Sequence, residues 1–263
     1  MTQSLKESLP KIIVSGSSWA RGEWVFGKPI VQHSGIIQYF TDAGYNVIPV
    51  SQARSYHSRV IEYLDKKLEE HYTENSVIFF IMADPLLDLI MPELASLKLK
   101  RTGDVTNLPM LTDKIQQAGG INNLIRQEQD TIYKQLDTVA KKYNATIHCI
   151  GGTYNLNTNI LSKYTNLNPL VVSWIDLLVG HFQDYSHENI SDPEFGITYT
   201  WTISYIDLSM YDPAFAEQVK QEFDIISKRF YILEEDIFHP DGLHPNRHGH
   251  KILYDKITQL LNL

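Results

Sequence analysis

The sequence predicts an α/β protein, a three-layer α/β/α sandwich built around a mostly parallel sheet. Short runs rich in Val, Ile and Phe alternate along the chain with longer amphipathic segments. One of these runs, SVIFFIM at 76–82, is apolar at nearly every position, which is typical of a strand buried on both faces of a parallel sheet. Strands that alternate with helices imply right-handed crossovers and helices on both faces of the sheet.

Each expected element has its own pattern. The segment 58–72 repeats Val60, Ile61, Leu64 and Leu68 on one face with charges opposite, which predicts a helix. Similar spacing predicts helices at 35–44, 122–144 and 250–263. Short β-rich or apolar runs predict strands at 11–15, 46–50, 76–82 and 145–152.

The composition favours one domain spanning residues 1–263. The chain is 43% hydrophobic and 21% charged, and it shows no Pro/Gly/Ser-rich linker, fixed-period repeat or low-complexity tract. Two stretches fit the alternation poorly: 86–121 is rich in Leu, Pro and Lys, and 182–211 contains many aromatic and acidic residues. We expect both to be insertions or a lid over one edge of the sheet.

Charge and cysteine content exclude several functional classes. A net charge of −8 and a pI near 5.7 argue against a nucleic-acid partner, because nonspecific binding of phosphate backbones depends on clustered Lys and Arg. Cys149 is the only cysteine, so no intrachain disulfide or thiolate zinc site can form, and we interpret it as buried packing. The N-terminus lacks a secretory signal pattern and no run approaches about 18 apolar residues, so we expect a cytoplasmic protein without a membrane partner.

The first strand ends in the turn GSSW, which raises the question of a nucleophile. In parallel sheets, working residues gather at the carboxyl ends of the strands. The loops Gly16–Ser18, Ser51–Ser55, Ala83–Asp88 and Gly151–Asn155 should therefore share one edge. A plain strand-to-helix turn with a capping serine is the alternative for the first loop.

The tail supplies the partners that such a serine needs. In FHPDGLHPNRHGH, Asp241 and His244 are three residues apart, just before the last expected helix. In a turn, that spacing lets the carboxylate reach the imidazole Nδ1–H, which leaves Nε2 available as a base. Pro245 favours the start of the helix, and Gly242 lets the turn tighten.

These two blocks resemble the SGNH (GDSL-type) hydrolases, whose signature is a Gly-Asp-Ser turn after the first strand and an Asp-x-x-His before the last helix. GSSWARGEW resembles the first block with Ser17 in place of the Asp, and DGLHPNRHGHKIL resembles the second. The resemblance covers nearly the whole chain and implies a flavodoxin-like sheet. It implies Ser18 as nucleophile, His244 as general base and Asp241 as the orienting acid. The implied activity is ester hydrolysis or acyl transfer through an acyl-serine, with carbohydrate O-acyl groups as the substrate class.

The same resemblance implies three oxyanion donors: the amide of the nucleophile, a glycine amide after the second strand and an asparagine side chain after the third. Here the second position falls in SQARSYH, where Ser55 is the candidate. Ala83 stands at the asparagine position and is followed by Asp84, and GGTYN offers Thr153 and Asn155 as substitutes. These departures favour an alternative, a catalytically impaired module that binds a glycan or protein.

A metal site is a further alternative, because the tail is dense in His and Asp. The candidate ligands are His239, Asp241, His244, His248 and His250. A triad explains Asp241 and His244 without metal, so we expect none, with His248 and His250 on an exposed helix start. No strand-to-helix turn carries G-x-G-x-x-G or a phosphate-binding lysine loop, so no organic cofactor is implied. The sequence does not determine the oligomeric state.

Several residues near these loops have two interpretations each. Trp19 and Trp24 either stack on substrate or pack in the core. Asp84 and Asp88 either bind substrate hydroxyls or cap a following helix. Glu23 either contributes to the site or forms a surface ion pair with Arg21 or Arg54. The remaining histidines have no partner pattern, and we expect each to be solvated or satisfied by hydrogen bonds: His33, His57, His71, His148, His181 and His187.

Overall fold

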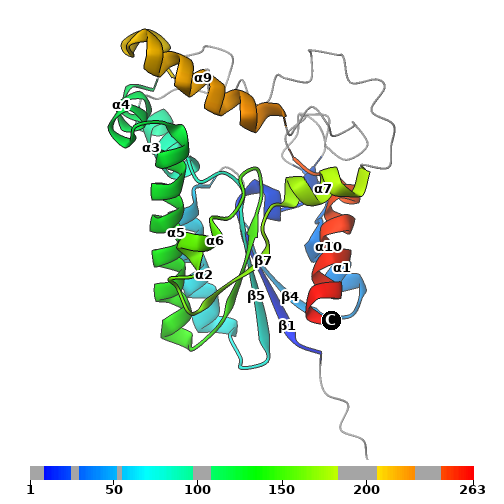
Figure 1. Cartoon of the computed structure of the whole chain (residues 1–263). Coiled ribbons are helices and arrows are strands. Elements are labelled where there is room, and N and C mark those ends of the chain that lie inside the picture. Colours follow the sequence, from blue (N-terminus) through cyan, green and yellow to red (C-terminus); the bar gives the residue numbers. More distant parts are fainter. Residues whose placement is uncertain (1–8, 25–29, 52–54, 97–107, 183–205, 229–243) are drawn as a thin grey trace, which may run out of the picture.

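A five-stranded parallel sheet forms the centre of the protein in the computed structural model (Figure 1). The structure describes residues 9–24, 30–51, 55–96, 108–182, 206–228 and 244–263. The strand order is β4-β1-β5-β6-β7, and every neighbouring pair is parallel. The strands are β1 (Lys11–Gly16), β4 (Asn46–Ser51), β5 (Ser76–Met82), β6 (Ile147–Gly151) and β7 (Leu167–Val171). This is the flavodoxin-like order, so the predicted fold class is confirmed.

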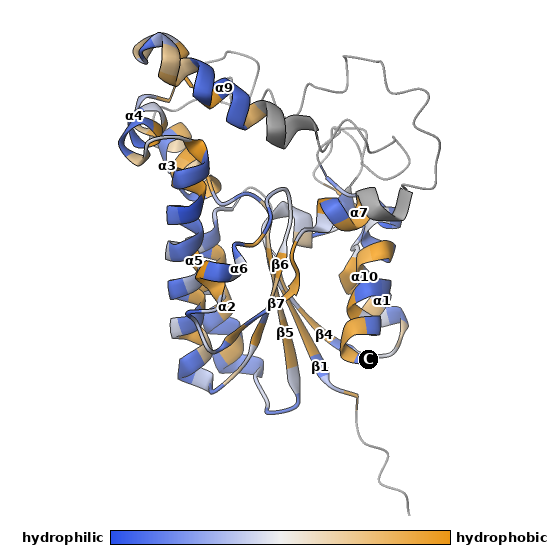
Figure 2. Ribbon diagram, in the orientation of Figure 1, coloured by the Kyte–Doolittle hydropathy of each residue, from blue (hydrophilic) through white to orange (hydrophobic). Residues whose placement is uncertain are grey.

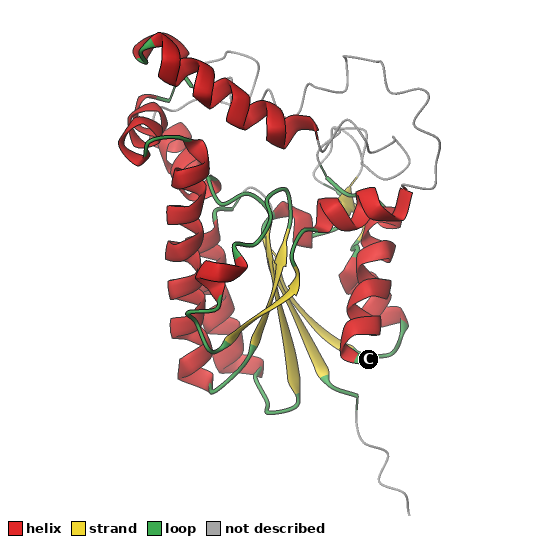
Figure 3. Cartoon of the chain, viewed as in Figure 1, coloured by secondary structure: helices red, strands yellow, loops and turns green. Residues whose placement is uncertain are grey.

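Helices cover both faces of the sheet, as Figures 1 and 3 show. On one side lie α2 (His57–His71), α5 (Ile121–Tyr143) and the short α6 (Thr158–Leu161). On the other lie α1 (Ile36–Asp42), α7 (Trp174–Phe182) and α10 (Arg247–Leu261). The three layers predicted from the alternation of strands and helices are therefore present.

Alternation along each central strand divides the core in two. Ile12 and Val14 of β1 belong to the cluster beneath α1, α7 and α10, whereas Ile13 belongs to the cluster beneath α2 and α5. In β5, Phe79 and Phe80 divide in the same way. Figure 2 shows the apolar strands enclosed by helices with polar outer surfaces. Burial on both faces explains why these strands are continuously apolar in the sequence.

The sequence analysis predicted one edge strand of the sheet and missed the other. β4 and β7 lie at the two edges of the sheet, and each contains a proline, Pro49 and Pro169. Proline cannot donate to a ladder, and it is tolerated at an edge. The sequence analysis found β4 but not β7, because LNPLV interrupts its apolar positions with Asn and Pro.

Helices from one poorly fitting region, 86–121, stand beyond the carboxyl ends of the strands (Figure 1). Segment 86–121 contains α3 (Leu87–Ser96) and α4 (Pro109–Ala118), and α9 (Pro213–Lys228) lies beside them. Glu222 of α9 accepts hydrogen bonds from the first amides of α5, those of Ile121 and Asn122, at 2.7 and 3.1 Å. Of segment 182–211, residues 183–205 lie outside the described residues. A lid function for these segments stays a prediction.

No helix in the described part of the chain combines the length and apolar character needed to cross a membrane.

Cys149 is buried in β6, as expected, and burial raises the pKa of its thiol to about 12.

Candidate active site

The turn after β1 places Ser18 at the carboxyl edge of the sheet. Gly16 has φ +152°, and a Cβ there would lie 2.7 Å from the backbone oxygen of Ile81, so only glycine fits without strain. Ser17 is buried, and its hydroxyl has no hydrogen-bond partner among the described residues. Ser18 then begins a short 3₁₀ turn, Ser18–Ala20, and is only half-buried. The turn thus buries one serine and presents the next.

The approach to α10 places His244. Asn246 caps this helix, with its side-chain oxygen accepting hydrogen bonds from the amides of His248 and Gly249 at 2.9 and 3.1 Å. The helix therefore begins at Arg247, three residues before the predicted start. Pro245 is buried and lies before the capping residue instead of in the first turn, so its predicted place at the helix start is corrected.

The structure brings Ser18 and His244 together. The Nε2 atom of His244 lies 2.9 Å from the hydroxyl oxygen of Ser18, across 226 positions of sequence. Nε2 is the ring nitrogen that the Asp-x-x-His spacing leaves available for a serine. Both residues are half-buried, so the pair is open to solvent on part of its surface. Asp241 lies outside the described residues, and its role stays a prediction.

The loops after β5 and β6 meet at the same edge. Gly152 donates its amide to the Met82 carbonyl at 2.9 Å, and a Cβ on Gly152 would lie 2.7 Å from Cα of Ala83. Thr153 donates both its amide and its hydroxyl to the carbonyl of Ala83. The Thr153 hydroxyl proton, considered a substitute oxyanion donor, is therefore used to join the two loops. Ala83 is itself buried.

Two other predicted binding residues lie in the neighbouring loops. Ser55 is buried just before α2. Asn155 is half-buried, and its backbone carbonyl accepts a hydrogen bond from Nε2 of Gln129 on α5 at 2.7 Å. That contact fixes the backbone of the loop after β6 against α5.

The two aspartates after β5 act on helix starts. Asp84 accepts a hydrogen bond from the amide of Leu86 at 2.9 Å, just before α3, and burial raises the pKa of its carboxyl to about 6. Asp88 does not cap α3 but α2: its two oxygens accept from the amides of His57 and Ser58 at 2.7 and 2.8 Å. It also contacts His57 Nδ1 at 2.9 Å and the Ser58 hydroxyl at 2.6 Å. Asp88 therefore caps a helix, but this helix is α2, which precedes it in the chain, and not the following helix that the sequence analysis considered.

The prediction that His250 lies on an exposed helix start is wrong. His248 is exposed as expected, but His250 is fully buried, and its ring lies 4.9 Å from that of Trp174 at an interplanar angle of 74°. Neither ring nitrogen has a hydrogen-bond partner among the described residues. Burial, with smaller effects from nearby His33 and His244, lowers the pKa of His250 to about 3. His250 lies four residues after the capping residue Asn246, on the buried face of α10. The spacing of polar residues in the sequence did not reveal this.

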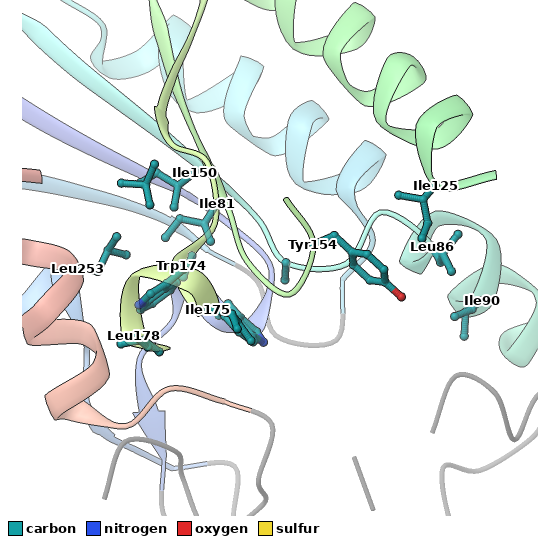
Figure 4. Packing of buried hydrophobic residues seen from close by; sticks show 14 of the residues in the cluster. Ile81, Leu86, Ile90, Ile125, Ile150, Tyr154, Trp174, Ile175, Leu178 and Leu253 are labelled. Atoms are coloured by element: carbon teal, nitrogen blue, oxygen red, sulfur yellow. The ribbon is translucent and has the colours of Figure 1, made fainter. Parts of the chain in front are cut away.

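Trp19 belongs to the core. It is 2% exposed and meets Trp174 edge-on at 5.4 Å, and Trp174 donates to the Gly249 carbonyl at 3.2 Å. Figure 4 shows Trp174, with Ile175 and Leu178, packed among the apolar residues of the strands and α10. The core interpretation of Trp19 therefore holds. The side chain of Trp24 lies outside the described residues.

Glu23 pairs with a residue that sequence analysis did not consider. It forms an ion pair with Arg247; Arg54 lies outside the described residues, so a pair with Arg54 stays a prediction. Oε2 of Glu23 accepts from the backbone amide and Nε of Arg247 at 2.7 and 3.1 Å, and Oε1 accepts from Nη2 at 3.0 Å. The partners are 224 positions apart, so no local pattern could have identified them.

The other described histidines are mostly bound to neighbours. His57 contacts Asp88, His33 accepts from the amide of Gly35 at 3.0 Å, and His148 contacts the Asn168 amide at 3.0 Å. In the described part of the chain, no group of three or more His, Cys, Asp or Glu residues is arranged to hold a metal ion. His239 and Asp241, two of the candidate ligands, lie outside it, as does His187.

Comparisons with known proteins find a likeness to solved structures and no match to a sequence family. No protein-family model matches the sequence, and a search of curated proteins finds no significant match. Among solved structures, the chain is similar to the psychrotrophic esterase EstA from Pseudoalteromonas sp., in a structure inhibited by monoethylphosphonate. The match covers 97% of this chain and 100% of that chain, with 14% sequence identity and a TM-score of 0.40. At that level of similarity, a function for this chain has to be argued from its own residues.

Proposed function

We propose that this protein is a serine hydrolase that cleaves carboxylic esters through an acyl-serine intermediate. The observation that carries the proposal is the 2.9 Å contact between His244 Nε2 and the Ser18 hydroxyl. A serine hydroxyl is a weak nucleophile at neutral pH and needs an adjacent base. The Gly-x-Ser and Asp-x-x-His blocks that supply these residues resemble those of SGNH hydrolases, which supports the same assignment.

The proposed reaction uses the pair twice. In the first step the Ser18 oxygen attacks the ester carbonyl while Nε2 of His244 takes the hydroxyl proton. The imidazolium then gives this proton to the departing alkoxide, which leaves as the alcohol. The acyl group remains on Ser18 as an ester. In the second step His244 takes a proton from water, the hydroxide attacks the acyl group, and the proton returns to Ser18 as the acid is released. We assign Asp241 the task of orienting the imidazole through Nδ1.

We assign the developing oxyanion to backbone amides of Ser18 and Ala83, since Ala83 has no side-chain amide. Asp84, Ser55 and Asn155 are proposed to line the alcohol or acyl side of the same edge. Loss of a single oxyanion donor typically costs about a hundredfold or more in rate. We therefore expect turnover slower than in enzymes that provide three donors.

A test is the release of nitrophenol from nitrophenyl acetate by purified protein, with Ser18→Ala as the matched control. The proposal predicts an initial burst of nitrophenol followed by slower turnover, and neither in the control. The same pair of proteins can then be offered O-acetylated sugars, with acetate release as the readout, to test carbohydrate O-acyl groups as the substrate class. Equal rates for wild type and Ser18→Ala on every ester would refute the hydrolase assignment.

A binding module on the same scaffold is the second candidate. The aliphatic Ala83 at the position of a side-chain donor and the engaged Thr153 hydroxyl favour it. Its signature is glycan or protein binding that Ser18→Ala leaves unchanged, with no ester turnover above that of the variant.

A further inference from the structure

The ion pair between Glu23 and Arg247 joins the two segments that carry the proposed catalytic residues. Glu23 opens β2 (Glu23–Trp24), five residues after Ser18, and Arg247 is the first residue of α10, three residues after His244. Besides the hydrogen bond between Ser18 and His244 themselves, this pair connects the first block of the sequence to the last.

The geometry of the pair is that of a rigid connection. Both carboxylate oxygens of Glu23 accept from the Arg247 guanidinium, and one also accepts from its backbone amide. Bidentate, charge-assisted contacts of this kind are stronger and more directional than a simple surface ion pair. The Glu23 side chain is only 12% exposed, so water competes little for the carboxylate. The bond to the backbone amide fixes the main chain of Arg247, beyond its flexible side chain.

Short, constrained segments connect Arg247 to His244 and Glu23 to Ser18. Only Pro245 and Asn246 separate Arg247 from His244; the proline is buried with a restricted φ, and the asparagine caps α10. The hydroxyl of Tyr39 on α1 donates to the Arg247 carbonyl at 2.9 Å, so the peptide groups on both sides of the Arg247 Cα are held by hydrogen bonds. On the Ser18 side, β2 pairs with β3 (Val31–His33), with Glu23 opposite His33.

We propose that Glu23 and Arg247 are positioning residues for the acyl transfer, holding the His244 imidazole within reach of the Ser18 hydroxyl. Neither residue touches the reacting atoms. This inference rests on the proposed function, since it names how the same site is assembled. A displacement of about 1 Å in a catalytic group can cost about a hundredfold in rate, which sets the size of the expected effect.

The kinetic test compares Glu23→Ala and Glu23→Gln with Asp255→Asn. Asp255 forms an exposed ion pair with Lys251 on the outer surface of the same helix, so its variant is the matched control. We expect kcat on nitrophenyl acetate to fall about 100-fold in Glu23→Ala, with KM within about twofold. Glu23→Gln keeps one oxygen that can accept from the Arg247 amide and should lose only about tenfold. The control should match wild type. An unchanged kcat in folded Glu23→Ala would overturn the inference.

A second measurement separates this inference from the proposed function. In protein labelled with ¹⁵N-histidine, the Nε2 resonance of His244, assigned with His244→Asn, reports its hydrogen bond to Ser18. We expect Ser18→Ala and Glu23→Ala to shift this resonance, and Asp255→Asn to leave it in place. These shifts without ester turnover would support the positioning role and count against the hydrolase. Ester turnover with an unchanged resonance in Glu23→Ala would support the hydrolase and count against the positioning role.

Discussion

His244 and His57 stand at the same edge of one sheet, yet their surroundings differ. His244 is half-buried and directs Nε2 at the Ser18 hydroxyl. His57 is fully buried, and Asp88 contacts its Nδ1 at 2.9 Å while also accepting from the backbone amides that begin α2. Its Nε2 has no hydrogen-bond partner among the described residues. An imidazole beside a carboxylate is therefore not enough for catalysis; the free nitrogen must face a nucleophile that substrate can reach.

The electrostatics of the Asp88 cluster agree with a structural role. Burial alone would raise the pKa of Asp88, but hydrogen bonds from His57 and Ser58 outweigh it and hold this pKa below its usual value. The carboxylate is thus kept ionised at the start of a 15-residue helix, where negative charge is stabilising.

The largest expected effect belongs to the His244 side of the comparison. Ser18→Ala and His244→Ala should each lower kcat on an aryl ester by about a thousandfold or more, because they remove the nucleophile or its base. The double variant should be little worse than either single one, since the two groups act as a unit. Steady-state kinetics on the folded variants check both points. A loss under tenfold in His244→Ala would contradict the assignment of the base.

For Asp88 and its partners His57 and Ser58, we expect a loss of stability with little loss of activity. Asp88→Ala should lower the free energy of unfolding by about 3 kcal/mol, because it leaves the buried His57 and two helix amides without their acceptor. Urea denaturation measures the loss, and Asp65→Ala, which breaks an ion pair with exposed Lys142 and a hydrogen bond from the Tyr143 hydroxyl, should cost only about 1 kcal/mol. The folded fraction of Asp88→Ala should keep kcat within about threefold. A thousandfold loss of kcat there would erase the distinction between the two histidines.

His250 provides the smallest effect, and it depends on pH. Its folded pKa of about 3 lies below the usual 6.5, so the unfolded chain binds a proton that the native chain does not. Stability should therefore be fully present above pH 6.5 and be lost as the pH falls toward 3. At pH 5 the loss is about 2 kcal/mol. His250→Phe should remove this part of the acid sensitivity in denaturation curves at pH 7 and pH 5. An unchanged difference between the two pH values would show that His250 does not titrate in this way.

The sequence predicts those elements whose hydrophobic pattern is contained within a single segment. The buried strands β1, β5 and β6 and the amphipathic helices α2 and α5 have periodic patterns within a single segment, and all were predicted near their observed ends. The proximity of Ser18 to His244 was expected from the resemblance of their two sequence blocks to those of SGNH hydrolases, whereas the carboxyl-end rule for parallel strands placed only Ser18 at this edge.

The rest depends on tertiary packing. The cap that Asp88 gives to α2 joins residues about 30 positions apart, and the pair of Glu23 and Arg247 spans 224. The inward face of His250 depends on the register of α10 against α7, which a motif dense in histidine obscures. Such contacts leave no periodic trace in the sequence.

The central claim is that His244 activates the Ser18 hydroxyl, and covalent labelling tests it most directly. Wild-type protein treated with a reactive fluorophosphonate, digested and mapped by mass spectrometry should carry one phosphonyl group on Ser18, and His244→Ala should carry almost none. Absence of label on wild-type Ser18, or equal labelling of Ser18 in His244→Ala, would contradict the account.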